Sequence, residues 1–463
     1  MGVTHALASY ASELEFDQLP NEVVSQAKRV ILDLCGCILS GHPLPLGKRI
    51  VKLGELTGAE PKECTVLGTD LRLSCTAAAY ANGALADVMD WNDMLYVGHP
   101  ATAVVSAALG MGEKLDSSGK EVVEAVVAAY EVFARIGLAV QPTEERQREA
   151  MWGMLTWIPF CSAVATGKLM KLDQFQMATA MGIAAAFAPL GGNSKYIETR
   201  SDTYHHVHGV ASMQGVFAAM HASAGTTGMD TILEGPRGFW MMAYSDLCDW
   251  DWLDASLSTL GRDYWILKTL FKKWPANLWV QSYLDILYDL VARHEISYQD
   301  IKEITVDPSQ GMLMTYRQRG AMDAAFSLPY TLAVALIEPK PGWRWYDEVL
   351  LHDPQVLSLV AKVRTADGAR VTDRVHEFNN YRRGAWMPAQ IDIMTVSGKR
   401  YRGHATFPKG HPSNPMSDEE LEKKFALAAN GTLAPGKAAE AIDLISNLER
   451  LESIQELINV LRK

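Results

Sequence analysis

The densest group of polar side chains in the sequence directly follows an Ala-rich stretch that ends near residue 86. The group consists of Asp87, Asp90, Asn92, Asp93 and, a few residues later, His99. A carboxylate near an imidazole can act as a general base or can orient one. Buried carboxylates are costly unless they are paired or used. The group is therefore a candidate acid–base site, and the simpler interpretation is a solvent-exposed acidic loop at the end of a helix.

Three histidines within four residues form a second candidate site, His205, His206 and His208, and Tyr204 precedes them. His205 and His208 stand three residues apart, as helical metal ligands can. The sequence has neither a His-Glu-x-x-His motif nor a cysteine partner nearby. We therefore predict no metal, and we interpret the segment as the polar lining of a site or as a plain surface loop.

Two adjacent lysines, Lys272 and Lys273, form a third candidate site between Phe271 and Trp274-Pro275. A lysine beside an aromatic wall and a proline turn can bind a carboxylate. Once removed from water, its pKa can shift so that it serves as an acid or a base. The alternative interpretation is a pair of solvent-exposed lysines.

Composition and missing motifs exclude several classes of function. Lys and Arg minus Asp and Glu give 43 − 54 = −11, which argues against nucleic-acid or anionic-membrane partners because both favour clustered positive charge. The sequence has no Gly-rich phosphate loop in a strand–helix context and no Gly-x-Ser-x-Gly elbow. We therefore predict an enzyme without an organic cofactor. Scattered cysteines and the lack of a basic-then-apolar leader favour a cytoplasmic protein.

Helical patterns dominate the first two-thirds of the chain. In residues 20–41 the apolar residues recur at three- and four-residue steps, Asp33 interrupts the pattern, and Gly36 allows a close helix neighbour. Residues 74–89 are mostly small and apolar, a composition that is typical of closely packed helices. Residues 101–113, 121–140, 161–188 and 209–224 have the same composition.

The pattern changes near residue 265. Strand-like segments are expected at 301–306, 371–378, 390–396 and 400–406, with a helix at 324–337 and a return to helix from Ser417. The predicted fold is mainly α, a large all-helical domain formed by both termini plus an inserted, smaller α+β lid domain. The predicted limits are 1–265 and 396–463 for the helical domain and 266–395 for the lid.

Several segments, in order, resemble the MmgE/PrpD superfamily. They are Leu19-Pro20, Asn82 to Ala86 with Asp90 and His99-Pro100, Phe326 to Tyr330, and Lys409 to Ser417. The resemblance implies a helical domain with an inserted lid, a homodimer, and no metal or organic cofactor. It also implies a reaction in which a proton leaves or joins a carbon next to a carboxylate.

The resemblance assigns roles position by position. Asp90 resembles the first Asp of the family's Asp-x-Asp-Asp-Thr segment, His99 its following His, and Lys272 the lysine before the family's Tyr-Pro step. We therefore predict Asp90, His99 and Lys272 as catalytic residues. The predicted substrate-binding residues are Asp93, Met94, Trp152, Tyr204, His206, Lys273 and Tyr330.

The sequence departs from the family pattern at several positions. Asn92 and Met94 replace an Asp and a Thr, and Gln281 falls near a lid His. The Trp152 region replaces a family His, and Tyr204 falls at or near a family Lys. Fewer cations imply a substrate with fewer carboxylates or a more apolar body. The predicted function is a cofactor-independent lyase or isomerase (dehydratase- or epimerase-like) acting on a small-molecule carboxylate; the alternative is a non-catalytic metabolite-binding protein.

Overall fold

The computed structural model describes residues 2–96, 98–140, 143–145, 156–188, 201–243, 248–310, 313–372, 379–381 and 384–463. Their contacts divide the chain into two compact units. Unit 1 contains residues 1–88, 92–269 and 418–463, and unit 2 contains residues 89–91 and 270–417. The chain is mainly helical with a small sheet, which confirms the predicted fold class at that level. The domain limits at residues 266 and 395 stay predictions.

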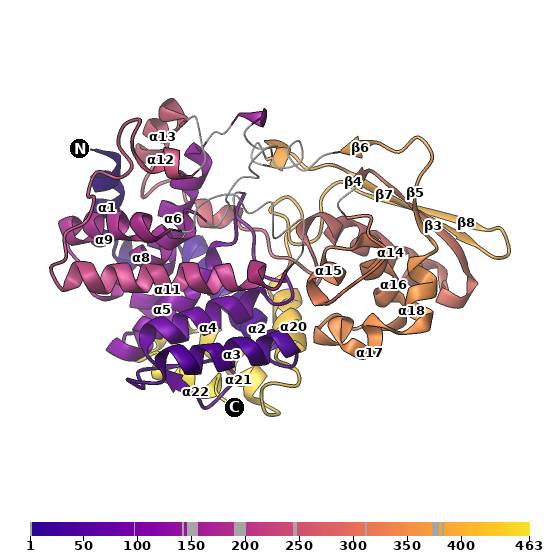
Figure 1. Ribbon diagram of the computed structural model, residues 1–463, viewed down its shortest axis with the longest axis horizontal. Coiled ribbons are helices and arrows are strands. Elements are labelled where there is room, and N and C mark those ends of the chain that lie inside the picture. Colours follow the sequence, from indigo (N-terminus) through magenta and orange to yellow (C-terminus); the bar gives the residue numbers. More distant parts are fainter. Residues whose placement is uncertain are drawn as a thin grey trace. The chain divides into compact units, whose positions relative to one another are not determined.

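Unit 1 is a bundle of helices that includes residues from both ends of the sequence (Figure 1). Its longer helices are α1 (Val3–Glu13), α2 (Asn21–Gly41), α3 (Pro45–Gly58), α4 (Cys75–Asp87), α5 (Pro100–Leu115), α6 (Gly119–Ala139), α8 (Ile158–Leu169), α9 (Gln174–Phe187), α11 (Thr203–Ser223), α20 (Asp418–Ala429) and α21 (Lys437–Ser446). Shorter elements are α12 (Phe239–Met242), α13 (Trp250–Leu257), α22 (Gln455–Val460) and the hairpin of β1 (Cys64–Thr65) and β2 (Arg72–Leu73).

The contact between α2 and α20 explains two unusual residues of the N-terminal pattern. Asp33 is buried and pairs with the buried Lys424, with Nζ 2.5 Å from Oδ1. A Cβ on Gly36 would lie 3.2 Å from the Phe425 ring, so glycine allows the two helices to approach closely. The charge that interrupts the apolar face of α2 is therefore the partner of a buried lysine on α20.

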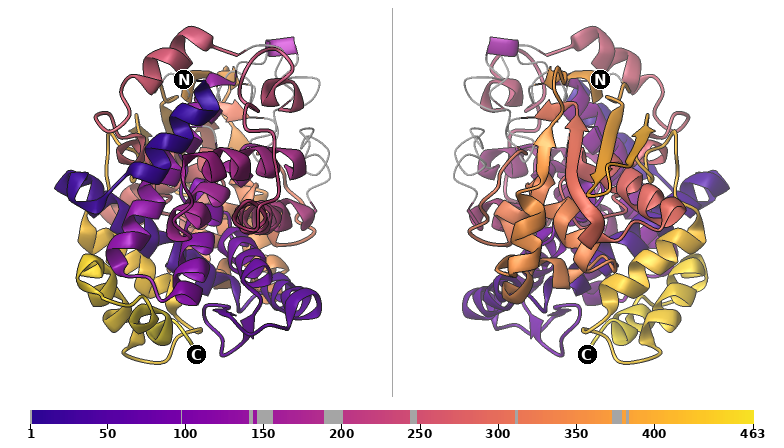
Figure 2. Two further views of the ribbon diagram at one scale, coloured as in Figure 1. Left: turned by 90° about the vertical axis from the view of Figure 1, so that its left-hand side faces the viewer. Right: turned by 90° about the vertical axis from the view of Figure 1, so that its right-hand side faces the viewer.

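Unit 2 is built around a four-stranded sheet in the order β5-β3-β7-β8 (Figure 2, right). The strands are β3 (Ile301–Asp307), β5 (Val363–Thr365), β7 (Ala389–Thr395) and β8 (Arg400–Ala405), with a separate pair of β4 (Ser309–Gln310) and β6 (Val371–Thr372). β3 and β5 are parallel, and the β3–β7 and β7–β8 pairs are antiparallel. Buried and half-buried residues alternate along β7, as expected for a strand with one covered face.

Helices cover the sheet of unit 2: α14 (Gln281–His294) packs on β7 and β8, and α16 (Leu328–Ile337) packs on α14 and α18 (Pro354–Val360). Two further short helices of this unit are α15 (Ala321–Ala325) and α17 (Glu348–Leu351). The segment predicted as one helix is interrupted at Phe326-Ser327. The Ser327 hydroxyl accepts the Tyr330 backbone N–H and so begins α16 anew.

Across the part of the chain that the structure describes, no single helix has the length and apolarity needed to cross a membrane. By length and composition alone, α2 and α3 pass that test together, as a pair bent by 98°.

Candidate active site

Two glycines allow α4 and α11 to cross at very short range. A Cβ built on Gly209 would lie 2.3 Å from the Tyr80 carbonyl oxygen and 2.8 Å from the Ala84 Cβ. A Cβ on Gly83 would lie 3.2 Å from the Gly209 Cα. Small residues let helix backbones approach in this way. The crossing brings Asp87, the last residue of α4, to the first turns of α11.

Replacing this glycine tests how strongly the crossing positions the site. We expect Gly209→Ala to lower the free energy of unfolding by about 1–3 kcal/mol, because the new methyl group would overlap a backbone oxygen that cannot rotate away. The change in urea midpoint at constant slope measures the effect. Gly225→Ala is a poor control because Gly225 has a positive φ. Ala224→Gly, just after α11, is better. A Gly209→Ala protein as stable as wild type would contradict the close crossing.

Asp87 is the centre of a buried polar cluster in unit 1. Its Oδ2 lies 2.8 Å from His205 Nδ1 and 3.5 Å from His208 Nε2, and its Oδ1 accepts a 2.7 Å hydrogen bond from the Asn92 amide. Burial alone would raise the pKa of the Asp87 carboxyl. The charges of the neighbouring imidazoles of His208 and His205, and the hydrogen bond from His205, outweigh burial and hold this pKa below its usual range. The environment of Asp87 therefore favours its ionised form.

His208 is hydrogen-bonded within the protein through its Nδ1. Thr102 donates its hydroxyl proton to the His99 carbonyl at 2.8 Å, so Thr102 Oγ1 accepts from His208 Nδ1 at 3.1 Å. Within the described ranges no group of three or more His, Cys, Asp or Glu side chains is arranged to hold a metal ion.

His99 has a fixed tautomer. Its Nδ1 lies 2.6 Å from the backbone carbonyl oxygen of Asp93, and a carbonyl oxygen can only accept, so Nδ1 carries the proton. The basic nitrogen of the neutral ring is therefore Nε2. The carboxylate of Asp93 accepts the Tyr130 hydroxyl at 2.7 Å and the Ala101 N–H at 3.3 Å. These bonds hold the loop that orients His99.

The other unit 1 residues predicted to bind substrate differ in environment. The buried Tyr204 ring lies edge-on to the His205 and His208 rings, with centroids 5.5 and 5.8 Å apart. Met94 is also buried. His206 is half-buried and its Nδ1 lies 2.6 Å from the Tyr80 hydroxyl, not in the Asp87 cluster. Trp152 lies outside the described residues.

In unit 2, Lys272 and Asp90 form a completely buried ion pair. The Lys272 ammonium donates to the Asp90 carboxylate and, at 2.7 Å, to the Asp90 backbone oxygen. Asn277 donates to the other carboxylate oxygen at 3.3 Å. Asp90 has a φ of 50°, in the left-handed region that a non-glycine residue adopts only at a cost. The structure thus brings together two of the three predicted catalytic residues.

Gln281 fixes the loop that carries Lys272. Its amide oxygen accepts the Trp274 N–H at 3.0 Å, and its amide nitrogen donates to the carbonyls of Trp274 and Ala276 at 3.0 and 2.9 Å. Lys273 is only half-buried, with Nζ 3.7 Å from the Asp285 carboxylate and over the Trp274 ring. The two adjacent lysines therefore differ completely in their exposure to water.

Tyr330 is buried in unit 2, and its hydroxyl donates to the Trp345 carbonyl at 2.5 Å. Burial raises the pKa of this phenol above its usual value. Both observations describe a structural tyrosine. Its predicted contact with substrate stays a prediction.

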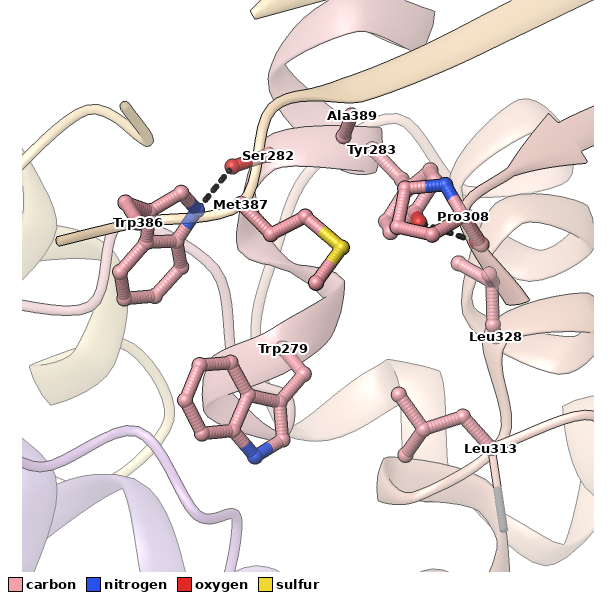
Figure 3. Close-up of a pocket in the computed structure, with 9 residues that line it drawn as sticks. All are labelled: Trp279, Ser282, Tyr283, Pro308, Leu313, Leu328, Trp386, Met387 and Ala389. Atoms are coloured by element: carbon pink, nitrogen blue, oxygen red, sulfur yellow. Dashed lines mark hydrogen bonds between the residues drawn. The ribbon is translucent and has the colours of Figure 1, made fainter. Parts of the chain in front are cut away.

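Unit 2 also contains a small cavity of about 20 Å³, room for roughly one water molecule (Figure 3). Its wall is mostly apolar and aromatic, and its polar groups are already bonded: the Trp386 indole donates to Ser282 and the Tyr283 hydroxyl to the Pro308 carbonyl. The cavity is too small to hold a metabolite.

Asp87, His205 and His208 belong to the two candidate groups of the sequence analysis but are not among its predicted catalytic and substrate-binding residues. A usable signal was present. A carboxylate at the C-terminal end of one helix and histidines in the first turns of another are both placed against the helix dipole. Such placements indicate that the carboxylate at the end of the first helix pairs with the histidines at the start of the second.

A histidine with a fixed Nδ1 donor, a buried cluster of one carboxylate and two imidazoles, and a buried lysine–aspartate pair are groups that can take part in proton transfer. The MmgE/PrpD N-terminal domain matches residues 5–250 and the MmgE/PrpD C-terminal domain matches residues 274–450. The chain therefore belongs to the MmgE/PrpD family.

Three relatives show the range of the similarity. The cis-aconitate decarboxylase of Aspergillus terreus is 24% identical, covering 99% of this chain and 96% of the relative. The human cis-aconitate decarboxylase is also 24% identical, covering 99% and 94%. A probable 2-methylcitrate dehydratase of Saccharomyces cerevisiae is 20% identical over 76% of this chain and 71% of its own. Decarboxylases and dehydratases are lyases, so the relatives support an enzyme of the lyase type.

Proposed function

We propose that the chain is a cofactor-independent lyase that acts on a carboxylate-bearing small molecule by proton transfer at the carbon alpha to a carboxylate. The observation that carries the proposal is the 2.6 Å contact from His99 Nδ1 to the Asp93 carbonyl. It makes Nε2 the nitrogen that exchanges protons, as a general base requires. The names of the relatives, which refer to cis-aconitate and 2-methylcitrate, support a carboxylate substrate.

Removing a proton next to a carboxylate creates negative charge that fixed cations and donors must stabilise. The sequence-based prediction assigns that stabilising charge, and the binding of a carboxylate group, to Lys272, and within unit 2 Asp90 and Asn277 position its ammonium. Tyr204, at or near the place of a family lysine, is proposed to contact the substrate. The substrate then has fewer carboxylates or a more apolar body than a tricarboxylate.

Proton NMR in D2O tests this function with the purified protein and a panel of acids. The panel contains 2-methylcitrate, cis-aconitate, iminodisuccinate and several hydroxy and amino diacids. We expect the signal of an alpha proton to disappear with one of them. New vinyl signals would identify a lyase acting by elimination, whereas deuterium at one carbon with unchanged connectivity would identify an epimerase.

A non-catalytic binding protein would give a different result in the same NMR experiment. It would bind an acid, seen as a rise in Tm, without exchanging any proton of that acid. That outcome would replace the proposed lyase by the binding protein.

A further inference from the structure

The lysine that the sequence predicts as catalytic, Lys272, lies in an irregular segment of unit 2, residues 271–277. A side chain on such a segment is held in place by contacts with neighbouring elements. Gln281, the first residue of α14, provides two of these contacts through the backbone of Trp274. Asp285 follows Gln281 by four residues on the same helix, so both side chains are on one face of α14.

The carboxylate of Asp285 joins two segments that are far apart in the sequence. Its Oδ1 accepts the indole N–H of Trp274 at 2.9 Å, and its Oδ2 accepts the backbone N–H of Lys409 at 2.6 Å. The Asp285 side chain is only 17% exposed, and a carboxylate largely removed from water needs such donors. One side chain of α14 therefore ties the Lys272 segment to the segment around residue 409.

The same two segments also meet on the other side of Lys272. The backbone N–H of Phe271 donates to the Gly410 carbonyl at 3.1 Å. Gly410 has a φ of 96°, and a Cβ on it would lie 1.8 Å from the Phe271 carbonyl oxygen, so only glycine allows this approach. Phe271 precedes Lys272 and Trp274 follows it. Both ends of the short stretch that carries the lysine are therefore anchored on residues 409–410.

We propose that Asp285 is a positioning residue for Lys272. Its carboxylate holds the Trp274 end of the stretch against residues 409–410 and so keeps the Lys272 ammonium on the carboxylate of Asp90. The inference deepens the proposed function, in which Lys272 binds a carboxylate group of the substrate, and it rests on that function for its effect on turnover. The placement of Lys272 itself can be measured without any substrate.

Asparagine at position 285 separates the two hydrogen bonds at nearly unchanged volume. An amide has one acceptor oxygen, and its NH2 group can only donate. In Asp285→Asn the NH2 group would therefore face either the Trp274 indole N–H or the Lys409 backbone N–H, both of which are donors. One of the two bonds must break, and the stretch that carries Lys272 loses one of its anchors.

Acylation by acetic anhydride, read at each lysine by peptide mass spectrometry, measures how firmly Lys272 is held. The ammonium of wild-type Lys272 is completely buried and should react slowly. We expect Asp285→Asn to raise its rate of acylation by about 10-fold or more, through local opening of the segment. Lys424, a buried lysine of unit 1, reports global unfolding and should keep its wild-type rate. Asp289→Asn, one turn further along α14 at an exposed residue paired with Arg293, is the matched control.

The second variant distinguishes the hydrogen bonds of Asp285 from its ion pair. The Lys273 ammonium lies 3.7 Å from Asp285 Oδ1. Lys273→Ala removes this charge and leaves the bonds to Trp274 and Lys409 in place. Lys272 should therefore stay as protected in Lys273→Ala as in wild type.

Steady-state kinetics, on an acid that the wild-type protein turns over, give the readout that a purely structural role would not move. In Asp285→Asn a less firmly placed Lys272 should raise KM and lower kcat/KM, the latter by about 10-fold. A mere loss of folded protein would reduce the apparent kcat and leave KM unchanged. The measurements are made at a temperature at which both proteins are folded.

The outcomes separate this inference from the proposed function. If Lys272 is as protected in Asp285→Asn as in wild type, or if Lys272 and Lys424 become reactive together, Asp285 does not position Lys272 and the inference is overturned. Increased acylation of Lys272 alone, with an unchanged KM, would overturn its effect on substrate binding. If Lys272 becomes reactive as expected but wild type turns over none of the acids, the proposed function fails, while the placement of Lys272 by Asp285 stands.

Discussion

Replacing His99 by glutamine is expected to slow exchange of the substrate's alpha proton by about 10²–10⁴-fold, the usual contribution of a positioned acid–base group. Glutamine keeps an N–H donor for the Asp93 carbonyl but has no nitrogen that can accept a proton near neutral pH. The fold should therefore survive while the base is lost. Integration of the alpha-proton signal against time in D2O gives the rate directly.

The control for His99→Gln is His352→Gln, because His352 is an exposed histidine of unit 2 whose Nε2 lies 3.3 Å from the exposed Glu348. Its rate should equal that of wild type. Thermal unfolding of both variants shows whether either has lost structure. A His99→Gln protein with the Tm of wild type and more than a third of its exchange rate would disprove the role of His99 as the base.

Replacing Lys272 by alanine is expected to reduce the free energy of unfolding by about 3–5 kcal/mol, because it leaves the Asp90 carboxylate buried without its counter-ion. Asp90→Asn should be costly for the corresponding reason. The double variant Lys272→Met/Asp90→Asn, which removes both charges and keeps the volume, should recover much of the loss. Urea unfolding of wild type, Lys272→Met, Asp90→Asn and the double variant closes the cycle and measures the coupling of the pair.

Lys273→Ala is the matched control for this prediction. Its side chain is 35% exposed and its Nζ lies 3.7 Å from Asp285, so its loss should cost no more than about 1 kcal/mol. Equal losses from the two neighbouring lysines would contradict the burial of Lys272. Activity is to be compared only at urea concentrations and temperatures at which every variant is folded, since an unfolded Lys272→Ala protein would lose turnover for a trivial reason.

Much of the secondary structure follows from the sequence because its signals are local. The three- and four-residue steps in residues 20–41 predicted α2, which spans Asn21–Gly41. The alternating run at 301–306 is β3, and the segments at 390–396 and 400–406 are the hairpin of β7 and β8. The strand predicted at 371–378 is described only at Val371–Thr372, and the remainder lies outside the described residues.

The pairing of the polar residues was not predictable, because it depends on contacts between distant segments. Asp87 and His205 are 118 residues apart, and they meet because Gly83 and Gly209 let two helices cross closely. Nothing in the local pattern of either helix states which helix is its neighbour. The burial of Lys272, in contrast to Lys273, depends in the same way on tertiary contacts to residues 89–91.

The ion pair between Asp33 and Lys424 has a consequence for how the protein folds as it is made. Its two members are 391 residues apart, so at about 5–20 residues per second the ribosome needs about 20–80 seconds to make the second after the first. During that interval the carboxylate of α2 has no lysine, and the face that α20 covers is open to water or to a chaperone. Residues 270–417 leave the ribosome before α20. The α+β unit can therefore fold before the last helices of the helical bundle have been synthesised.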